Sequence, residues 1–325
     1  MADMKNILVV GATGQIGSDL VPELRRIYGN ENVIAVGSKT APSEELKSGP
    51  FEFADATNKT ALEALVKKYD IDTIYHLASI LSAKGEQNPD LAWHVNMQSL
   101  KNVLDLANEY KMTRVFWPSS IAAFGPTTPR DSTPQRTVLE PTTMYGVTKV
   151  SGELLCQYYF NKYGVDVRGL RYPGLISYKA LPGGGTTDYA VAIYYEALQH
   201  KKYTCFVSED TVLPMMYMDD AIRGTIELMK APASKITVRT SYNFAAISFS
   251  AKELAESVKK YIPKFKCNYK PDFRQKIADS WPKTIDDSQA RNDWGWKHEY
   301  TLDKMTQVML KKLREKLQIG AKPHT

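Results

Sequence analysis

The stretch Ile7-Leu8-Val9-Val10-Gly11-Ala12-Thr13-Gly14-Gln15-Ile16-Gly17 decides the fold of this chain. Its first four residues form a short apolar run, which is typical of a buried parallel strand. Three glycines follow, and apolar residues then recur at helical spacing over 15–28. A strand, a glycine turn and a helix in this order predict a site for the pyrophosphate of a dinucleotide.

Each glycine of this turn has its own purpose. Gly11 allows the tight turn, Gly14 lets the backbone approach the phosphates, and Gly17 lets the helix pack closely on the strand. The start of the helix offers unpaired N–H groups, so we also expect Gln15 and Ile16 to bind the cofactor. A tight turn that binds nothing is the alternative, and the strand and helix around the glycines disfavour it.

Strand and helix patterns alternate from residue 5 to about 175. We expect strands at 5–10, 32–36, 51–54, 73–76, 113–117 and 165–171, with helices at 15–28, 60–69, 90–110 and 144–163. This alternation is typical of a parallel sheet with helices on both faces. After Pro173 the pattern changes to helices at 187–200, 219–230 and 302–317, short strands at 203–207 and 236–244, and a capping box from Ser250 to Glu253.

The predicted fold is therefore α/β, a Rossmann-type doubly wound parallel sheet with a smaller C-terminal α/β substrate lobe. Residues 1–175 are expected to form the dinucleotide-binding domain. Residues 176–325 are expected to form mainly the substrate lobe, with some segments returning to the Rossmann core.

Composition narrows the class of protein. Of the 325 residues, 43% are hydrophobic and 24% are charged, as in ordinary globular proteins, and the net charge is only +6. No basic run with interleaved aromatics indicates a nucleic-acid partner. Cys156, Cys205 and Cys267 are far apart, which argues against a disulfide framework or a metal site. No stretch suits a membrane span and no targeting segment is visible, so we expect the cytoplasm or the mitochondrial matrix.

Tyr145 and Lys149 are the candidate catalytic pair. They are four residues apart, so in a helix they share one face. An ammonium beside a phenol favours the ionised phenol, which can then act as a base. Oxidation of an alcohol needs such a base, because the hydroxyl proton must leave as hydride departs. A surface Tyr–Lys pair is the alternative.

The spacing Gly-x-x-Gly-x-x-Gly, together with Tyr-x-x-x-Lys, resembles the extended branch of the short-chain dehydrogenase/reductase superfamily. Five further segments match it: His76-Leu77-Ala78-Ser79, Val95-Asn96-Met97, Ser119-Ser120-Ile121-Ala122-Ala123-Phe124-Gly125, Arg171-Tyr172-Pro173-Gly174 and Met218-Asp219-Asp220-Ala221. The resemblance implies that Ser120 carries the catalytic hydroxyl, with Ser119 as the alternative. It also implies that Lys149 bonds the ribose of the nicotinamide.

The same resemblance implies further cofactor contacts. These are Leu77, Ala78, Asn96, Tyr145, Lys149, Tyr172 and Pro173, with Asp55 and Ala56 beside the adenine. NAD-preferring proteins usually carry an acid at the end of the second strand, but here the residues are Val36-Gly37-Ser38-Lys39. We expect NAD, with Ser38 at the ribose, although Lys39 leaves NADP open.

Longer strings, most of them in the second half of the chain, resemble the short-chain type of L-threonine 3-dehydrogenase. The matching strings are Tyr172–Ser177, Pro182–Ala190, Leu81-Ser82-Ala83 and Ser280-Trp281-Pro282. The resemblance implies oxidation of the C3 hydroxyl of L-threonine to 2-amino-3-ketobutyrate. Ser82, Thr186 and Thr187 are then substrate ligands together with Ser120 and Tyr145, and Trp281 covers the pocket. Helix capping by Thr186 or Thr187, and a core position for Trp281, are the alternatives.

Two other functions remain open at this stage. A sugar-nucleotide epimerase or dehydratase of the same superfamily would use the same Ser120, Tyr145 and Lys149. A non-catalytic dinucleotide sensor would have little need for all three. The resemblance also implies a homodimer in which helices 90–110 and 144–163 pair across a two-fold axis, through residues such as Leu100, Val103, Leu104, Leu154 and Leu155.

Overall fold

A central sheet of parallel strands organises the molecule in the computed structural model, which describes residues 4–318. The strand order is β10-β6-β5-β4-β1-β2-β3, and every pairing is parallel. The strands are β1 (Ile7–Val10), β2 (Val33–Gly37), β3 (Phe51–Phe53), β4 (Thr73–His76), β5 (Arg114–Ser120), β6 (Val167–Tyr172) and β10 (Tyr242–Asn243). The order changes direction at β1, so the sheet is doubly wound, as predicted.

Both faces of this sheet are buried, which explains the continuous apolar runs of its strands. Ile7 and Val9 point into one core and Leu8 and Val10 into the other. The first core is covered by α1 (Gln15–Tyr28), α8 (Met218–Lys230) and α11 (Ser288–Trp294). The second is covered by α2 (Lys59–Lys68), α5 (Ser99–Glu109) and α6 (Met144–Tyr163). Helices α1 and α6 each begin at the carboxyl edge of the sheet.

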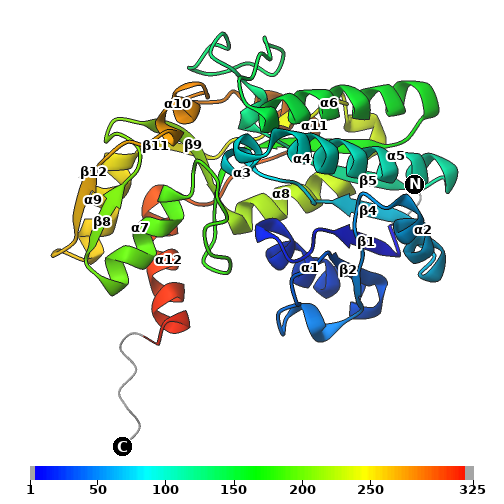
Figure 1. The fold of residues 1–325 in the computed structure, drawn as a ribbon, viewed down its shortest axis with the longest axis horizontal. Coiled ribbons are helices and arrows are strands. Elements are labelled where there is room, and N and C mark those ends of the chain that lie inside the picture. Colours follow the sequence, from blue (N-terminus) through cyan, green and yellow to red (C-terminus); the bar gives the residue numbers. More distant parts are fainter. Residues whose placement is uncertain (1–3, 319–325) are drawn as a thin grey trace, which may run out of the picture.

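A smaller α/β lobe lies beside the carboxyl edge, at the left of Figure 1. It contains β7 (Gly174–Ile176), β9 (Val212–Tyr217) and β11 (Ile247–Ser250) in one sheet and β8 (Lys202–Cys205) with β12 (Lys266–Tyr269) in another. Helices α7 (Tyr189–Gln199), α9 (Ala251–Tyr261), α10 (Arg274–Asp279) and α12 (Leu302–Lys316) enclose a core of their own. Two short helices, α3 (Ser82–Gln87) and α4 (Pro89–Trp93), follow β4.

The fold class predicted from the sequence is confirmed, and two local predictions need correction. The expected strand 236–244 is reduced to Tyr242–Asn243, because only these residues pair with β6 at the sheet edge. The expected helix 90–110 is divided into α4, a π-helical turn at His94–Gln98 and α5. The capping box of Ser250 and Glu253 is present at the start of α9.

Segments beyond residue 176 return to the main sheet. Helix α8 packs against α1, and β10 extends the sheet beside β6. The sequence did not predict β7, β9, β11 or β12. In residues 4–318, none of the helices has the length and apolar character that a membrane crossing needs. No group of three or more potential metal ligands gathers within the same range.

Candidate active site

A cavity of about 210 Å³ opens at the carboxyl ends of the central strands, between the sheet and the smaller lobe. Ligands of doubly wound sheets bind at this edge, where the strand order reverses. Residues from both halves of the chain line it: the glycine turn, the ends of β4, β5 and β6, helix α6 and the segment that precedes α7. The sequence-predicted residues in this lining are Gly11, Gly14, Gln15, Ile16, Gly17, Leu77, Ser82, Ser120, Tyr145, Lys149, Tyr172, Pro173, Thr186, Thr187 and Trp281.

The glycine turn fits the phosphates of a dinucleotide. Gly11 has a φ of +88°, and a Cβ there would lie 2.6 Å from the backbone nitrogen of Ala78. A Cβ on Gly17 would lie 2.5 Å from the carbonyl oxygen of Ala12, so larger residues are excluded at both positions. No side chain caps α1, whose first N–H groups remain for an anionic ligand.

Helix α6 carries Tyr145 and Lys149 in its first two turns. Its start is fixed twice, because Thr143 Oγ1 accepts a hydrogen bond from Gly146 N at 3.1 Å and Glu86 Oε1 accepts one from Met144 N at 2.7 Å. Further along, Gly152 allows close contact with β5, since a Cβ there would lie 2.4 Å from the Trp117 ring. The helix therefore enters the site in one defined position.

Ser120 ends β5 beside the phenol of Tyr145. Its Oγ accepts a hydrogen bond from Ala122 N at 3.2 Å, which leaves its own proton to be donated to the Tyr145 oxygen. Ser119 also lines the cavity, but its hydroxyl donates to Glu153 Oε1 at 2.6 Å. Ser120, unlike Ser119, thus keeps its hydroxyl proton available for the phenol.

Lys149 does not lower the pKa of Tyr145 here, so that prediction is wrong in direction. Burial raises the pKa of Tyr145 to about 12, and only the hydrogen bond from Ser120 opposes it. The ammonium of Lys149 lies 5.2 Å from the ring centroid and donates to the carbonyl oxygen of Pro118 at 2.7 Å. Burial also lowers the pKa of Lys149 to about 7.

Pro118 suits this position in β5. The pairing of β4 with β5 ends at Tyr75 and Phe116, so Pro118 is paired only with β6, opposite Leu170. Its missing N–H breaks no bond to β4 there, and its carbonyl remains free for Lys149.

Five predicted cofactor residues lie outside the cavity lining: Ser38, Asp55, Ala56, Ala78 and Asn96. Ser38 is exposed directly after β2. Asp55 follows β3, and its carboxylate accepts hydrogen bonds from Thr57 N and Thr57 Oγ1. Ala78 forms the wall against which Gly11 packs. Direct contact of these residues with a cofactor stays a prediction.

Asn96 positions the loop after β4. It lies in the π-helical turn, a distortion that is frequent at functional sites. Its Oδ1 accepts from Ile80 N at 2.7 Å, and its Nδ2 donates to Ile80 O at 3.2 Å and to Thr148 Oγ1 at 3.1 Å. The amide is thus engaged by the protein, and it ties this loop to helix α6.

The predicted substrate residues meet on the lobe side of the cavity. Ser82 Oγ and Thr186 Oγ1 lie 3.4 Å apart, although 104 positions separate them in the sequence. Neither Thr186 nor Thr187 caps α7 with its side chain. Trp281 lines the cavity and also belongs to the core of the lobe, and its role as a cover over the substrate stays a prediction.

Asp188 is a lining residue that the sequence analysis did not single out. Among the described residues that line the cavity, it is the only carboxylic acid. Its Oδ2 accepts hydrogen bonds from Gly184 N and Gly185 N, both at 2.8 Å, and burial raises its pKa. The signal was an acid directly after a glycine-rich loop, in a site expected to bind an ammonium group.

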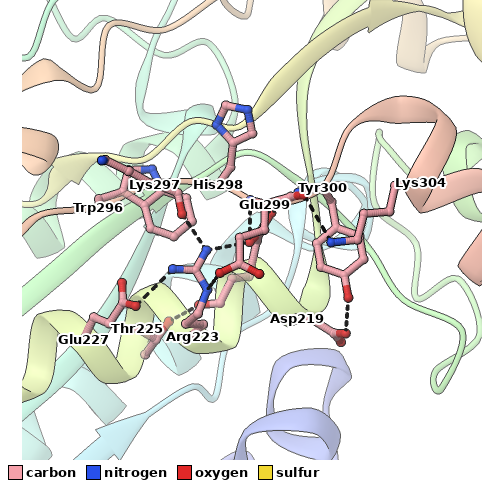
Figure 2. A network of polar contacts seen from close by, with 12 residues as sticks. Asp219, Arg223, Thr225, Glu227, Trp296, Lys297, His298, Glu299, Tyr300 and Lys304 are labelled. Atoms are coloured by element: carbon pink, nitrogen blue, oxygen red, sulfur yellow. Dashed lines mark hydrogen bonds and ion pairs between the residues drawn. The ribbon is translucent and has the colours of Figure 1, made fainter.

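The Asp219-Asp220 segment has a different task from the site residues. Asp220 accepts hydrogen bonds from the backbone of Glu299 and Tyr300 and pairs with Arg223 at 2.7 Å. Arg223 in turn bonds Glu227 and the carbonyl oxygen of Lys297 (Figure 2). This network fastens the segment before α12 onto α8 and contributes no residue to the cavity lining.

Comparison with known proteins gives the family. The model of the NAD dependent epimerase/dehydratase family matches residues 7–245, and this chain belongs to that family. A curated relative from Staphylococcus haemolyticus, described as an uncharacterized epimerase/dehydratase, is 50% identical over 97% of this chain and 99% of its own length. The family description implies a nicotinamide cofactor.

Solved structures narrow the comparison. An L-threonine dehydrogenase from Clostridium difficile is 53% identical over 97% of this chain and 99% of its own, with a TM-score of 0.94. The holo form of an L-threonine dehydrogenase from Cupriavidus necator is 52% identical over 95% and 99%, with a TM-score of 0.92. A monomeric L-threonine 3-dehydrogenase of metagenomic origin is 49% identical over 95% and 99%, with a TM-score of 0.92. A UDP-glucose 4-epimerase from Thermotoga maritima, 20% identical, shares the fold.

Proposed function

We propose that this protein is an NAD-dependent L-threonine 3-dehydrogenase, which oxidises the C3 hydroxyl to give 2-amino-3-ketobutyrate. The observation that carries the proposal is one cavity in which Ser120, Tyr145 and Lys149 face Thr186 and Asp188. The first three residues suit the removal of a proton from a hydroxyl. The last two suit the two charged ends of a small amino acid.

The substrate is bound by complementary charges and hydrogen bonds. Asp188 accepts hydrogen bonds from the ammonium group, while the hydroxyls of Ser82 and Thr186 donate to the carboxylate. Trp281 closes the pocket and excludes water, which strengthens these interactions. A sugar nucleotide has no ammonium group to pair with Asp188, and the epimerase of similar fold is too distant to support that alternative.

The reaction removes a hydride and a proton from the substrate alcohol. NAD⁺ supplies the acceptor for the hydride that leaves C3. Tyr145 takes the hydroxyl proton on its phenolate oxygen, and Ser120 orients the same hydroxyl. Lys149 is assigned to the ribose of the nicotinamide, as the family resemblance implies. The C–H and O–H bonds break and the C3–O bond becomes a carbonyl.

The proposal is tested by following NADH absorbance with L-threonine as substrate. Wild type should reduce NAD⁺, and Tyr145→Phe should lower kcat by about 10²-fold while it keeps its fold and its cofactor affinity. If Tyr145→Phe turned over threonine at nearly the wild-type rate, Tyr145 would not be the catalytic base. If wild type does not oxidise threonine but turns over UDP-glucose, the dehydrogenase proposal is wrong and the epimerase alternative takes its place.

A further inference from the structure

Glu153 and Arg171 form a buried ion pair behind the catalytic residues. Glu153 follows Lys149 by four residues and Tyr145 by eight, so all three lie on one face of α6. Glu153 Oε1 accepts from Ser119 Oγ at 2.6 Å and Arg171 Nε at 2.9 Å, and its Oε2 accepts from Arg171 Nη2 at 2.7 Å. The side chains of the pair are 1% and 3% exposed.

The two strands bonded by Glu153 are those that deliver residues to the cavity. Ser119 of β5 is paired with Arg171 of β6 in the sheet. The next residue of each strand, Ser120 and Tyr172, lines the cavity. The bonds of Glu153 therefore hold helix α6, about two turns beyond Tyr145, against the strand ends beside Ser120.

The network continues from Arg171 toward the edge of the sheet. Arg171 Nη1 donates to the carbonyl oxygen of Gln135 at 3.0 Å and to Asn243 Oδ1 at 3.1 Å. Asn243 Nδ2 then donates to the carbonyl oxygens of Thr133 and Asp286, both at 3.0 Å. One arginine thus joins α6 to two segments that lie far apart in the sequence.

The two segments are residues 130–135 and 281–286, and the second begins with Trp281, which forms one wall of the cavity. Thr133 N donates to Thr284 O at 3.0 Å, and Thr133 forms a parallel bridge with Ile285. Arg130 Nε donates to the carbonyl oxygen of Trp281 at 3.1 Å. A continuous set of bonds therefore runs from the catalytic face of α6 to Trp281.

Stability alone gives little reason for such a pair. Replacement of a buried ion pair by apolar residues of similar size is often neutral or stabilising, because both charges lose their hydration on burial. The charges contribute a defined geometry, because a bidentate arginine–carboxylate pair fixes the relative orientation of the two elements that carry it. We propose that Glu153 and Arg171 are positioning residues that set Tyr145 against Ser120 and couple this geometry to the Trp281 wall.

The test replaces both charges at once in the full-length enzyme with NAD bound. Glu153→Met/Arg171→Met leaves no buried unpaired charge, so the protein should fold with an unchanged affinity for NAD. Its kcat should fall by about 10-fold or more, because displacements of about 1 Å are costly in catalysis. The matched control is Asp220→Asn/Arg223→Met, which removes both charges of an ion pair remote from the cavity and should leave kcat unchanged.

The isotope effect with C3-deuterated threonine separates positioning from stability. A misplaced phenol slows the chemical step, so the isotope effect on kcat should rise in the double variant. A lower folded fraction would reduce kcat and leave the isotope effect unchanged. A folded double variant with kcat within two-fold of wild type and an unaltered isotope effect would overturn the proposal.

Two further outcomes also test the proposal: a double variant that does not fold, and a wild type that does not oxidise threonine. If the double variant does not fold, Ser119→Ala removes one bond from Glu153 without unpairing a charge. It must then raise the isotope effect, and an unaltered value contradicts the proposal. The assay rests on the proposed function. If wild type does not oxidise threonine, that function fails, and the same variants are compared in UDP-glucose epimerisation, where unaltered turnover in the folded double variant contradicts the positioning role.

Discussion

Tyr145 has to act as a base in surroundings that favour its neutral form. Burial raises the pKa of the phenol to about 12, and the hydrogen bond from Ser120 is the one contribution that lowers it. Ser120 Oγ accepts from Ala122 N, so its own proton stays available for the phenol. The structure thus assigns Ser120 a part in tuning the base as well as in orienting the substrate.

Replacement of Ser120 by alanine should alter the pH dependence of turnover. Without the donated hydrogen bond the pKa of Tyr145 rises further, and the phenolate forms only at higher pH. We expect the rising limb of kcat/KM in Ser120→Ala to move to higher pH, with kcat lowered by about 10²-fold at neutral pH. A pH series on both proteins measures this. A rising limb of kcat/KM at the same pH in Ser120→Ala as in wild type would contradict the role of Ser120 in tuning the pKa of Tyr145.

The family resemblance predicts NAD, and the residues after β2 reduce the expected margin over NADP. Ser38 and Lys39 are both exposed there, and neither is an acid that would bond the ribose 2′-hydroxyl. Ser38→Asp should therefore increase the ratio of kcat/KM for NAD over NADP, because an acid repels the 2′-phosphate. Lys39→Ala, the companion variant, should reduce activity with NADP more than with NAD. A wild type that works better with NADP would refute the preference.

At the scale of elements, the segment before α7 joins the lobe to the cofactor side. Asp188 holds the glycine loop through Gly184 N and Gly185 N, and Thr186 meets Ser82 of α3. The lobe and helix α3, which follows β4, therefore touch through residues assigned to the substrate. We expect this loop to be mobile in the free enzyme and to become ordered over bound threonine.

Thr186→Ala should raise KM for threonine and spare the affinity for NAD. It removes a hydrogen bond to the substrate carboxylate, and no bond to the cofactor is assigned to it. Steady-state kinetics measures the effect, and Thr187→Ala is compared in the same assay. Equal KM in wild type and Thr186→Ala would transfer the role to Thr187 or Ser82, and the dehydrogenase proposal would stand.

The sequence predicted the elements whose patterns are set locally. The glycine turn, the apolar strands and the box at Ser250 follow from short-range chemistry, and the structure contains them. The short strands of the lobe, such as β9, depend on partners far along the chain, so no local pattern indicates them. The π-helical turn around Asn96 likewise depends on hydrogen bonds with Ile80 and Thr148, which lie outside the turn.

The residues of the candidate site also divide into those that a local motif predicts and those that depend on the folded structure. Tyr145, Lys149 and Ser120 were found by motif and meet in one cavity. The direction of the Tyr145 pKa was mispredicted, because helical spacing says nothing of burial. Asp188 was missed because its importance depends on which face of the loop borders the cavity.

At the scale of the whole molecule, an apolar face on α4 and α6 predicts a homodimer. Leu91, Trp93, Leu154 and Tyr158 are between 46% and 58% exposed, and the two helices that carry them are in contact. The expected interface residues Leu100, Val103 and Leu104 are fully buried in the core and are therefore unavailable.

Sedimentation velocity at working concentration tests the assembly. Wild type should sediment as a dimer, and Leu154→Glu should shift the equilibrium toward monomer, because it places a charge in an apolar contact. Phe273→Glu is the control, since Phe273 is an exposed apolar residue that precedes α10 and belongs to neither α4 nor α6. A monomeric wild type would decide against the dimer.

The most direct test of the central claim follows the hydrogen at C3. L-threonine deuterated at C3 is incubated with the enzyme and NAD⁺, and the isolated NADH is analysed by mass spectrometry. The proposed function predicts one deuterium in each NADH formed, with 2-amino-3-ketobutyrate or its decarboxylation product in equal amount. NADH without deuterium, or no NADH at all while UDP-glucose is epimerised, would contradict it.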